Sequence, residues 1–188
     1  MKQRIVIITE DSTPDKSRKG DAFPAQLIFS GTFREVRIFS EKLDAILPTE
    51  LLIISSKYGL IDKNFIINSY SNNSHTTKEV HELNEKLSFV KIMSDKVKDS
   101  YFIILLLPAH YLRYLTREGW LSEIMDNHKL IIVTGKSLKV NLLNNINAMF
   151  LEKKGVARIG LRNQELIINK IKLYKIEQSL LFRQQNPF

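Results

Sequence analysis

The chain alternates between short, wholly apolar runs and longer segments whose apolar residues recur at helical spacing. Four of the short runs are typical of strands buried on both faces, as in a parallel sheet covered by helices. The third run is the most apolar and is expected at the centre of the sheet. The four predicted strands are Arg4 to Thr9, Leu51 to Ser55, Tyr101 to Leu107 and Lys129 to Thr134.

Amphipathic segments follow each of these strands and indicate helices. The first helix follows Gly31-Thr32 and stops at Pro48, and Thr76 and Glu79 form a capping-box pattern before the second. Gly119 is expected to interrupt the third helix, and Gly155 ends the fourth. The predicted helices span residues 32–47, 76–98, 108–125 and 138–154.

The last segment leaves two alternatives open. Val156 to Gly160 can form a fifth strand and Arg162 to Phe182 a closing helix, but residues 169–173 alternate like a strand. No repeat or linker divides the chain, so a single domain of residues 1–188 is expected. Residues 155–188 form a C-terminal extension whose helix or strand character the pattern does not decide.

Strand and helix in regular alternation imply right-handed crossovers and a parallel sheet between two helix layers. The sequence therefore predicts a three-layer, Rossmann-like α/β sandwich. Its mainly parallel sheet is expected to hold four or five strands.

Composition limits the function. The 188 residues include no cysteine, which excludes disulfides, thiolate nucleophiles and cysteine-ligated metals. The four histidines show no metal-pair spacing, so neither a metal site nor a cofactor is expected. A net charge of +8 favours an anionic small molecule or nucleic acid as partner, although the scattered lysines could equally reflect nucleotide bias. The longest compact apolar run has only strand length, so no membrane association and a cytoplasmic location are expected.

Polar residues follow all four predicted strands. Ligands of open parallel sheets bind beyond the carboxyl ends of the strands. Solvated loops are also polar, but two lysine-containing turns leading out of buried strands favour a site here. The candidate residues are Thr9, Glu10, Asp11 and Ser12 after the first strand, Ser55, Ser56, Lys57, Tyr58 and Gly59 after the second, His110 after the third, and Gly135, Lys136 and Ser137 after the fourth.

Five of these residues have both a functional and a structural interpretation. Glu10 or Asp11 could act as a general base or cap a loop, and Lys57 could hold an anion, act as a nucleophilic amine or lie on the surface. Tyr58 could stack on a base or pack, and His110 could act in acid–base chemistry or start a helix at the surface.

The glycines also carry expectations. Gly59 is expected in a turn that needs a positive φ or a close backbone approach. Gly135-Lys136-Ser137 resembles the end of a phosphate loop, but Leu130 stands where the upstream glycine is required. A phosphate loop is therefore rejected, and a simple anion site at a helix N-terminus remains.

Three segments of the chain carry a resemblance to a known family. The first is Phe29 to Arg37, which includes Thr32 and Arg34. The second is Ile53 to Ile61, which contains a lysine-tyrosine-glycine-leucine stretch, and the third is residues 66–70, which end in Tyr70. Together they resemble a family of small uncharacterised α/β proteins of archaea, bacteria and phages. Many members have a cysteine-serine-lysine-lysine stretch after the first strand, where this chain has Thr9 to Ser12.

The resemblance implies a distant likeness to uracil-DNA-glycosylase-type folds and a link to 7-deazaguanine modification of nucleic acids. The diagnostic glycosylase loops are absent, so ordinary uracil excision is not expected. Thr32, Arg34 and Tyr70 join the candidate binding residues on this basis.

Two hypotheses follow, with a small-molecule-binding or assembly protein as a third. In the first, an enzyme acts on a nucleobase, nucleoside or nucleotide: Glu10 or Asp11 serves as base, Lys57 and Lys136 hold the anionic part, and Tyr58 or Tyr70 stacks on the ring. In the second, a non-catalytic accessory protein of a modification system binds nucleic acid. Its phosphate contacts would be Arg158, Arg162, Lys170, Lys172, Lys175 and Arg183.

Overall fold

A central sheet of six strands runs through the part of the chain that the computed structural model describes, which is residues 4–12, 22–70, 76–136, 138, 147–155 and 157–185. The strand order is β4-β3-β1-β6-β7-β8. β4 runs antiparallel to β3, and all other neighbours are parallel. The strands are β1 (Arg4–Glu10), β3 (Thr49–Ser55), β4 (Gly59–Asp62), β6 (Ser100–Leu106), β7 (Lys129–Thr134) and β8 (Ala148–Glu152).

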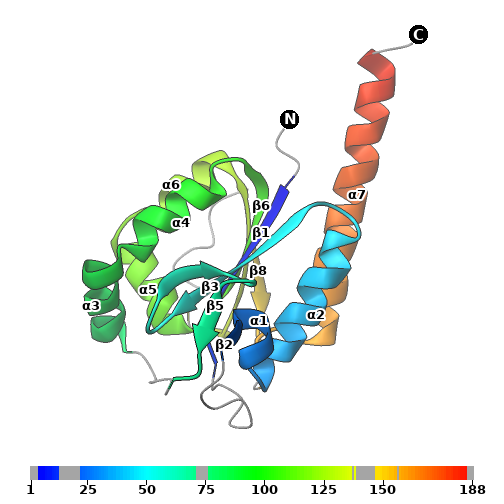
Figure 1. Ribbon diagram of the computed structural model, residues 1–188. Helices are drawn as coiled ribbons and strands as arrows, with labels where there is room; N and C mark the ends of the chain where they lie inside the picture. The colour runs from blue at the N-terminus through cyan, green and yellow to red at the C-terminus, as the bar shows by residue number, and fades with distance from the viewer. Residues whose placement is uncertain are drawn as a thin grey trace.

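Helices cover both faces of this sheet, and a two-stranded antiparallel sheet of β2 (Ala22–Pro24) and β5 (Ile66–Asn68) lies beside it. Figure 1 shows α1, α2 and α7 on one side and α3 to α6 on the other. The helices are α1 (Ala25–Ile28), α2 (Thr32–Asp44), α3 (Thr77–Leu87), α4 (Phe89–Val97), α5 (Ala109–Arg117), α6 (Trp120–Asn127) and α7 (Leu161–Gln185).

Each strand supplies residues to two cores, because successive side chains point to opposite faces of a sheet. In β1, Ile5 and Ile7 belong to the cluster that includes Phe33 of α2. Val6 and Ile8 belong to the cluster that includes Phe89 of α4. Burial on both faces explains why the predicted strands are continuous apolar runs rather than alternating ones.

The structure confirms the four predicted strands and places β6 next to β1 at the centre of the sheet. The capping box at the start of α3 is also present: Thr76 Oγ1 accepts a hydrogen bond from the Glu79 N–H at 3.3 Å, and the Glu79 carboxylate accepts one from the Thr76 N–H. The helix expected over 76–98 divides into α3 and α4 at Ser88, whose left-handed φ of 48° breaks the helical path.

The expected strand count was too low, for two reasons. A tight turn over residues 56–58 sends the chain back as β4 alongside β3. Ala148–Glu152, expected at the end of a helix, instead pairs with β7 as β8. A five-residue apolar segment has no period that separates helix from strand, and here sheet pairing decides. Residues 139–146 of that expected helix lie outside the described residues.

The C-terminal alternatives are also decided. Residues 157–160 do not form the expected strand, and α7 continues through 169–173. Ile167, Ile171 and Tyr174 are buried at helical spacing in the core of the α2 side, and this burial outweighs the local alternation. The fold is thus α/β with a mainly parallel sheet, compatible with the expected Rossmann-like sandwich. None of the described helices has the length and apolar character needed to cross a membrane.

Candidate functional site

The carboxyl ends of β1 and β3 lie side by side in the sheet (Figure 1). Glu10 pairs with Ile54, and the Asp11 N–H donates to the Ile54 carbonyl at 3.0 Å. The parallel register therefore brings the predicted residues 9–12 and 55–59 together, as expected from the strand-end rule.

Asp11 is the centre of this cluster and is 1% exposed. Its Oδ2 atom accepts three hydrogen bonds: from the Ser56 N–H at 2.8 Å, from the Ser56 hydroxyl at 3.0 Å and from the Tyr70 hydroxyl at 2.6 Å. Its Oδ1 atom is buried and has no hydrogen-bond partner within the described residues. A buried carboxylate oxygen without a partner is uncommon and marks Asp11 as a residue whose acceptors are not all used inside the protein.

The hydroxyl of Tyr70 links Asp11 to Ser55. Tyr70 Oη lies 2.7 Å from Ser55 Oγ, and Ser55 Oγ accepts the Lys57 and Tyr58 N–H groups at 3.2 and 3.1 Å. Because the Tyr70 proton is used on Asp11, the Ser55 hydroxyl donates to Tyr70. Burial, and next the Asp11 charge, raise the pKa of Tyr70, so its hydroxyl stays a donor.

Gly59 closes the turn after Tyr58 and meets both conditions expected of it. Its φ is +74°, and a Cβ atom there would lie 3.1 Å from Leu87 Cβ of α3. The turn therefore needs glycine for two reasons: the positive φ is strained for other residues, and α3 leaves no room for a side chain.

Lys57 is exposed, and its ammonium lies over two aromatic rings. Lys57 Nζ is 5.1 Å from the Tyr58 ring centre and 5.8 Å from that of Tyr70, and the two rings are 5.7 Å apart. These distances are typical of cation–π contacts. Among the described residues its ammonium forms no ion pair with a carboxylate. A positive charge beside a half-buried aromatic ring can bind an anion that carries a ring.

Arg158 holds the end of β1 in place and is 8% exposed. Its guanidinium donates to Thr9 Oγ1 at 2.7 Å, to Thr32 Oγ1 at 3.3 Å and to the carbonyls of Glu10 and Asp11. Arg158 Nη2 also lies 3.6 Å from Glu10 Oε1. The fork of donors is fully engaged inside the protein, so the prediction that Arg158 contacts phosphates at the surface is wrong.

Glu10 is the carboxyl group of the site with a raised pKa. Burial, and less strongly the Asp11 charge, raise the pKa of Glu10 from 4.5 to about 7, while Arg158 opposes the rise. The charges of Glu10 and Asp11 also raise the pKa of Tyr111, after the larger effect of burial, which places Tyr111 in the same electrostatic environment. A carboxyl group with a pKa near 7 can both donate and accept a proton at neutral pH.

Three of the remaining predicted residues form hydrogen bonds near the cluster. Thr9 and Thr32 accept from Arg158, and Ser12 donates to the Ser30 carbonyl at 2.9 Å. Arg34 is exposed on the first turn of α2 with no described contact to the cluster.

The other predicted strand ends add less. His110 is half-buried on α5, with its ring 4.9 Å from that of Tyr111. Gly135 and Lys136 are exposed beyond β7, and no hydrogen bond or ion pair between described residues joins them to Asp11. Ser137, and with it the expected helix N-terminus, lies outside the described residues. No group of three or more potential metal-ligating side chains occurs in the described part of the chain.

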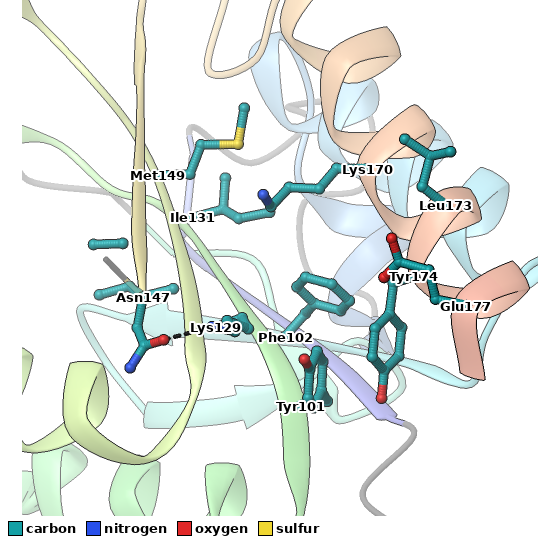
Figure 2. A pocket seen from close by; sticks show the side chains of 12 residues that line it. Tyr101, Phe102, Lys129, Ile131, Asn147, Met149, Lys170, Leu173, Tyr174 and Glu177 are labelled. Atoms are coloured by element: carbon teal, nitrogen blue, oxygen red, sulfur yellow. Dashed lines mark hydrogen bonds between the residues drawn. The ribbon is translucent and has the colours of Figure 1, made fainter. Parts of the chain in front are cut away.

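Two cavities lined by described residues lie elsewhere. One, of about 280 Å³, lies between α7 and the amino ends of β6, β7 and β8, and includes Lys129 and the stacked rings of Tyr101 and Tyr174 at 4.1 Å (Figure 2). The other, of about 290 Å³, is bounded by β8 and the start of α7. Neither includes Asp11 or Lys57.

Sequence reasoning gave neither Arg158 nor Tyr111 a role in the site. Arg158 stands alone in the small and apolar stretch Gly155 to Gly160, and a lone charge in such a stretch is a signal of burial with partners. Tyr111 follows His110 at the predicted start of a helix, directly beyond the central strand. The sequence shows that Tyr111 follows the strand end, but it does not show that Tyr111 lies close to Glu10.

The fold and site define an α/β protein with an acidic, arginine-supported cluster at the carboxyl edge of its sheet. Comparison with models of known families, with curated proteins and with solved structures gives no match to this chain. The argument about function therefore depends on the cluster itself.

Proposed function

We propose that the protein is an enzyme acting on a nucleobase, nucleoside or nucleotide, with Glu10 as the proton-transfer group. The observation that carries this proposal is the Glu10–Asp11 pair at the end of the central strand β1, buried against Arg158, with the pKa of Glu10 raised to about 7. Perturbed carboxyl groups of this kind are concentrated at active sites.

The chemistry that suits the pair is cleavage or exchange of an N-glycosidic bond. In hydrolysis the C–N bond breaks, water adds to the sugar carbon and the departing base takes a proton. Protonated Glu10 can donate that proton. The Asp11 carboxylate, held by Ser56 and Tyr70, can stabilise the positive charge that develops on the sugar.

Lys57 and Tyr58 supply the binding surface. The Lys57 ammonium can hold a phosphate or another anionic group, and the half-buried Tyr58 ring can stack on a base. The Tyr70 hydroxyl is committed to Asp11, so we assign Tyr70 to positioning Asp11 and stacking to Tyr58.

Two finer assignments belong to the same proposal. The sheet and its two helix-covered faces support a Rossmann-like three-layer sandwich, with the site at its carboxyl edge. The resemblance around Lys57-Tyr58-Gly59 supports a 7-deazaguanine-type substrate.

A non-catalytic nucleic-acid-binding role has weaker support. Arg158 is not available to phosphates, and the exposed basic residues of α7, such as Lys170 and Lys172, are interspersed with Glu165 and Glu177. This role is an outcome of the test below rather than a second proposal.

The test is a thermal-shift measurement with guanosine, guanosine monophosphate and 7-deazaguanine bases. A ligand that binds only the native protein raises its melting temperature. We expect stabilisation of the parent, a smaller effect of the monophosphate in Lys57→Ala, and parental behaviour in Lys91→Ala, which removes an exposed lysine from α4. No stabilisation by any of these compounds, together with salt-dependent binding to RNA or DNA, would favour the accessory role.

A further inference from the structure

α7 carries two apolar faces. Ile167, Ile171 and Tyr174 are buried against the sheet and α2. A second apolar set is between 42% and 61% exposed: Leu166, Leu173, Ile176 and Leu180. At about 100° per residue the two sets point in roughly opposite directions from the helix axis. The helix is therefore packed on one side and has an apolar stripe on the other.

The exposed stripe has the spacing of a coiled coil. Positions 166, 173 and 180 are seven apart, and Ile176 follows Leu173 by three residues, as the d position follows a in a heptad. Asn169 occupies the other d position between Leu166 and Leu180, and Arg162 and Arg183 stand at the d positions beyond the two ends of the stripe.

We propose that α7 pairs with α7 of a second copy of this chain in a parallel, two-stranded coiled coil. The charges beside the stripe favour that partner. Glu165 and Lys172 occupy g positions, and Lys170 and Glu177 occupy e positions. In a parallel pair each g residue faces the e residue five positions later in the other helix, so Glu165 meets Lys170 and Lys172 meets Glu177 of the second copy.

Both of these contacts join opposite charges, and each occurs twice in a symmetric dimer. In an antiparallel pair e faces e and g faces g, and the register that matches Lys170 with Glu177 does not also match Glu165 with Lys172. The helix therefore complements itself best when the two copies run in the same direction.

The α2 side of α7 is opposite to the exposed stripe. Lys42 Nζ of α2 donates to Gln164 Oε1 at 3.3 Å, and Lys175 Nζ donates to the Ile46 carbonyl at 2.7 Å, so α2 lies on the packed side of α7. Figure 1 shows α7 along one side of the molecule, with its C-terminal part extending past the sheet. In Figure 2 Leu173 stands at the outer rim of the cavity beside α7.

The pairing would also orient the two candidate sites. α7 begins three residues after Arg158, which holds the end of β1. In a parallel dimer the two α7 N-termini lie at the same end, so both sites lie towards that end of the dimer.

The test uses charge reversal in the full chain, followed by sedimentation equilibrium over a concentration series. Lys172→Glu and Glu177→Lys each place like charges opposite one another twice in the homodimer. Each is expected to raise the dimer dissociation constant roughly 10- to 30-fold. An equimolar mixture of the two variants restores opposite charges at both contacts, so a heterodimer of parental strength should form. Lys91→Glu, on exposed α4, is the control and should leave the dissociation constant unchanged.

Three results would overturn the proposal. The parent chain could remain a monomer up to about 1 mM, the range of the weakest specific complexes. The single variants could dimerise as well as the parent. The mixture could fail to restore the dimer, which would reject the parallel arrangement. Circular dichroism of each variant confirms that a lost dimer is not a lost fold.

Discussion

Replacing Glu10 by glutamine removes the carboxyl group whose pKa burial raises from 4.5 to about 7. Glutamine has nearly the same shape and keeps an oxygen that can accept from Arg158. The difference between the two pKa values corresponds to about 3 kcal/mol, at about 1.4 kcal/mol for each pKa unit. The Glu10 side chain is 22% exposed, so solvent reduces this figure only modestly.

The sign follows from proton binding. Between pH 4.5 and 7 the folded protein keeps the Glu10 proton while the unfolded chain releases it, so the parent loses stability as the pH rises through this window. Below pH 4.5 both states are protonated and Glu10 contributes no pH dependence. The free energy of unfolding of Glu10→Gln, relative to that of the parent, should therefore rise by about 3 kcal/mol between pH 4.5 and pH 8.

Urea unfolding measures the free energy of unfolding of both proteins. The series runs in steps of about one pH unit from about pH 4.5 to about pH 8.5 and gives the difference between Glu10→Gln and the parent at each pH. Glu152→Gln, which removes an exposed carboxylate from β8, is the matched control and should give a nearly constant difference. Parallel stability curves for the parent and Glu10→Gln would refute the argument that burial raises the pKa of Glu10.

Three further substitutions test the framework of the site by their effect on the free energy of unfolding. Gly59→Ala should cost about 2 to 4 kcal/mol, because a Cβ at φ +74° is strained and would lie 3.1 Å from Leu87 Cβ; a loss below about 1 kcal/mol contradicts this packing. Tyr70→Phe should cost about 2 kcal/mol by removing a hydrogen bond to the Asp11 carboxylate, and an unchanged midpoint in urea would argue against that bond. Arg158→Lys should cost about 3 kcal/mol, since one ammonium cannot replace the fork of donors; full stability of this variant would show that the fork is dispensable.

The central part of the fold follows from local pattern. Four apolar runs with helices between them indicate a parallel sheet, and the strand-end rule then brings residues 9–12 and 55–59 together. Gly59 was predictable for the same reason, since an abrupt turn after a buried strand needs a residue free of side-chain constraints.

The parts that sequence did not indicate depend on contacts between distant segments. Arg158 reaches Thr9 across 149 residues, and no local period encodes such a contact. β8 was assigned to a helix because five apolar residues suit either structure until β7 lies beside them. Tyr70 was found through a resemblance, whereas its bond to Asp11 became visible only in three dimensions.

The measurement that tests the central claim most directly is the release of free base from guanosine and 7-deazaguanosine, detected by chromatography. The parent and Glu10→Gln are compared between about pH 5 and 9, on either side of the expected pKa of Glu10. The account predicts base release by the parent with a rate that changes near pH 7, and a loss of about 10²- to 10⁴-fold in Glu10→Gln. Thermal stabilisation by the nucleosides should persist in the variant. Base release at the same rate by both proteins, or by neither, would contradict the assignment of Glu10 as the proton-transfer group.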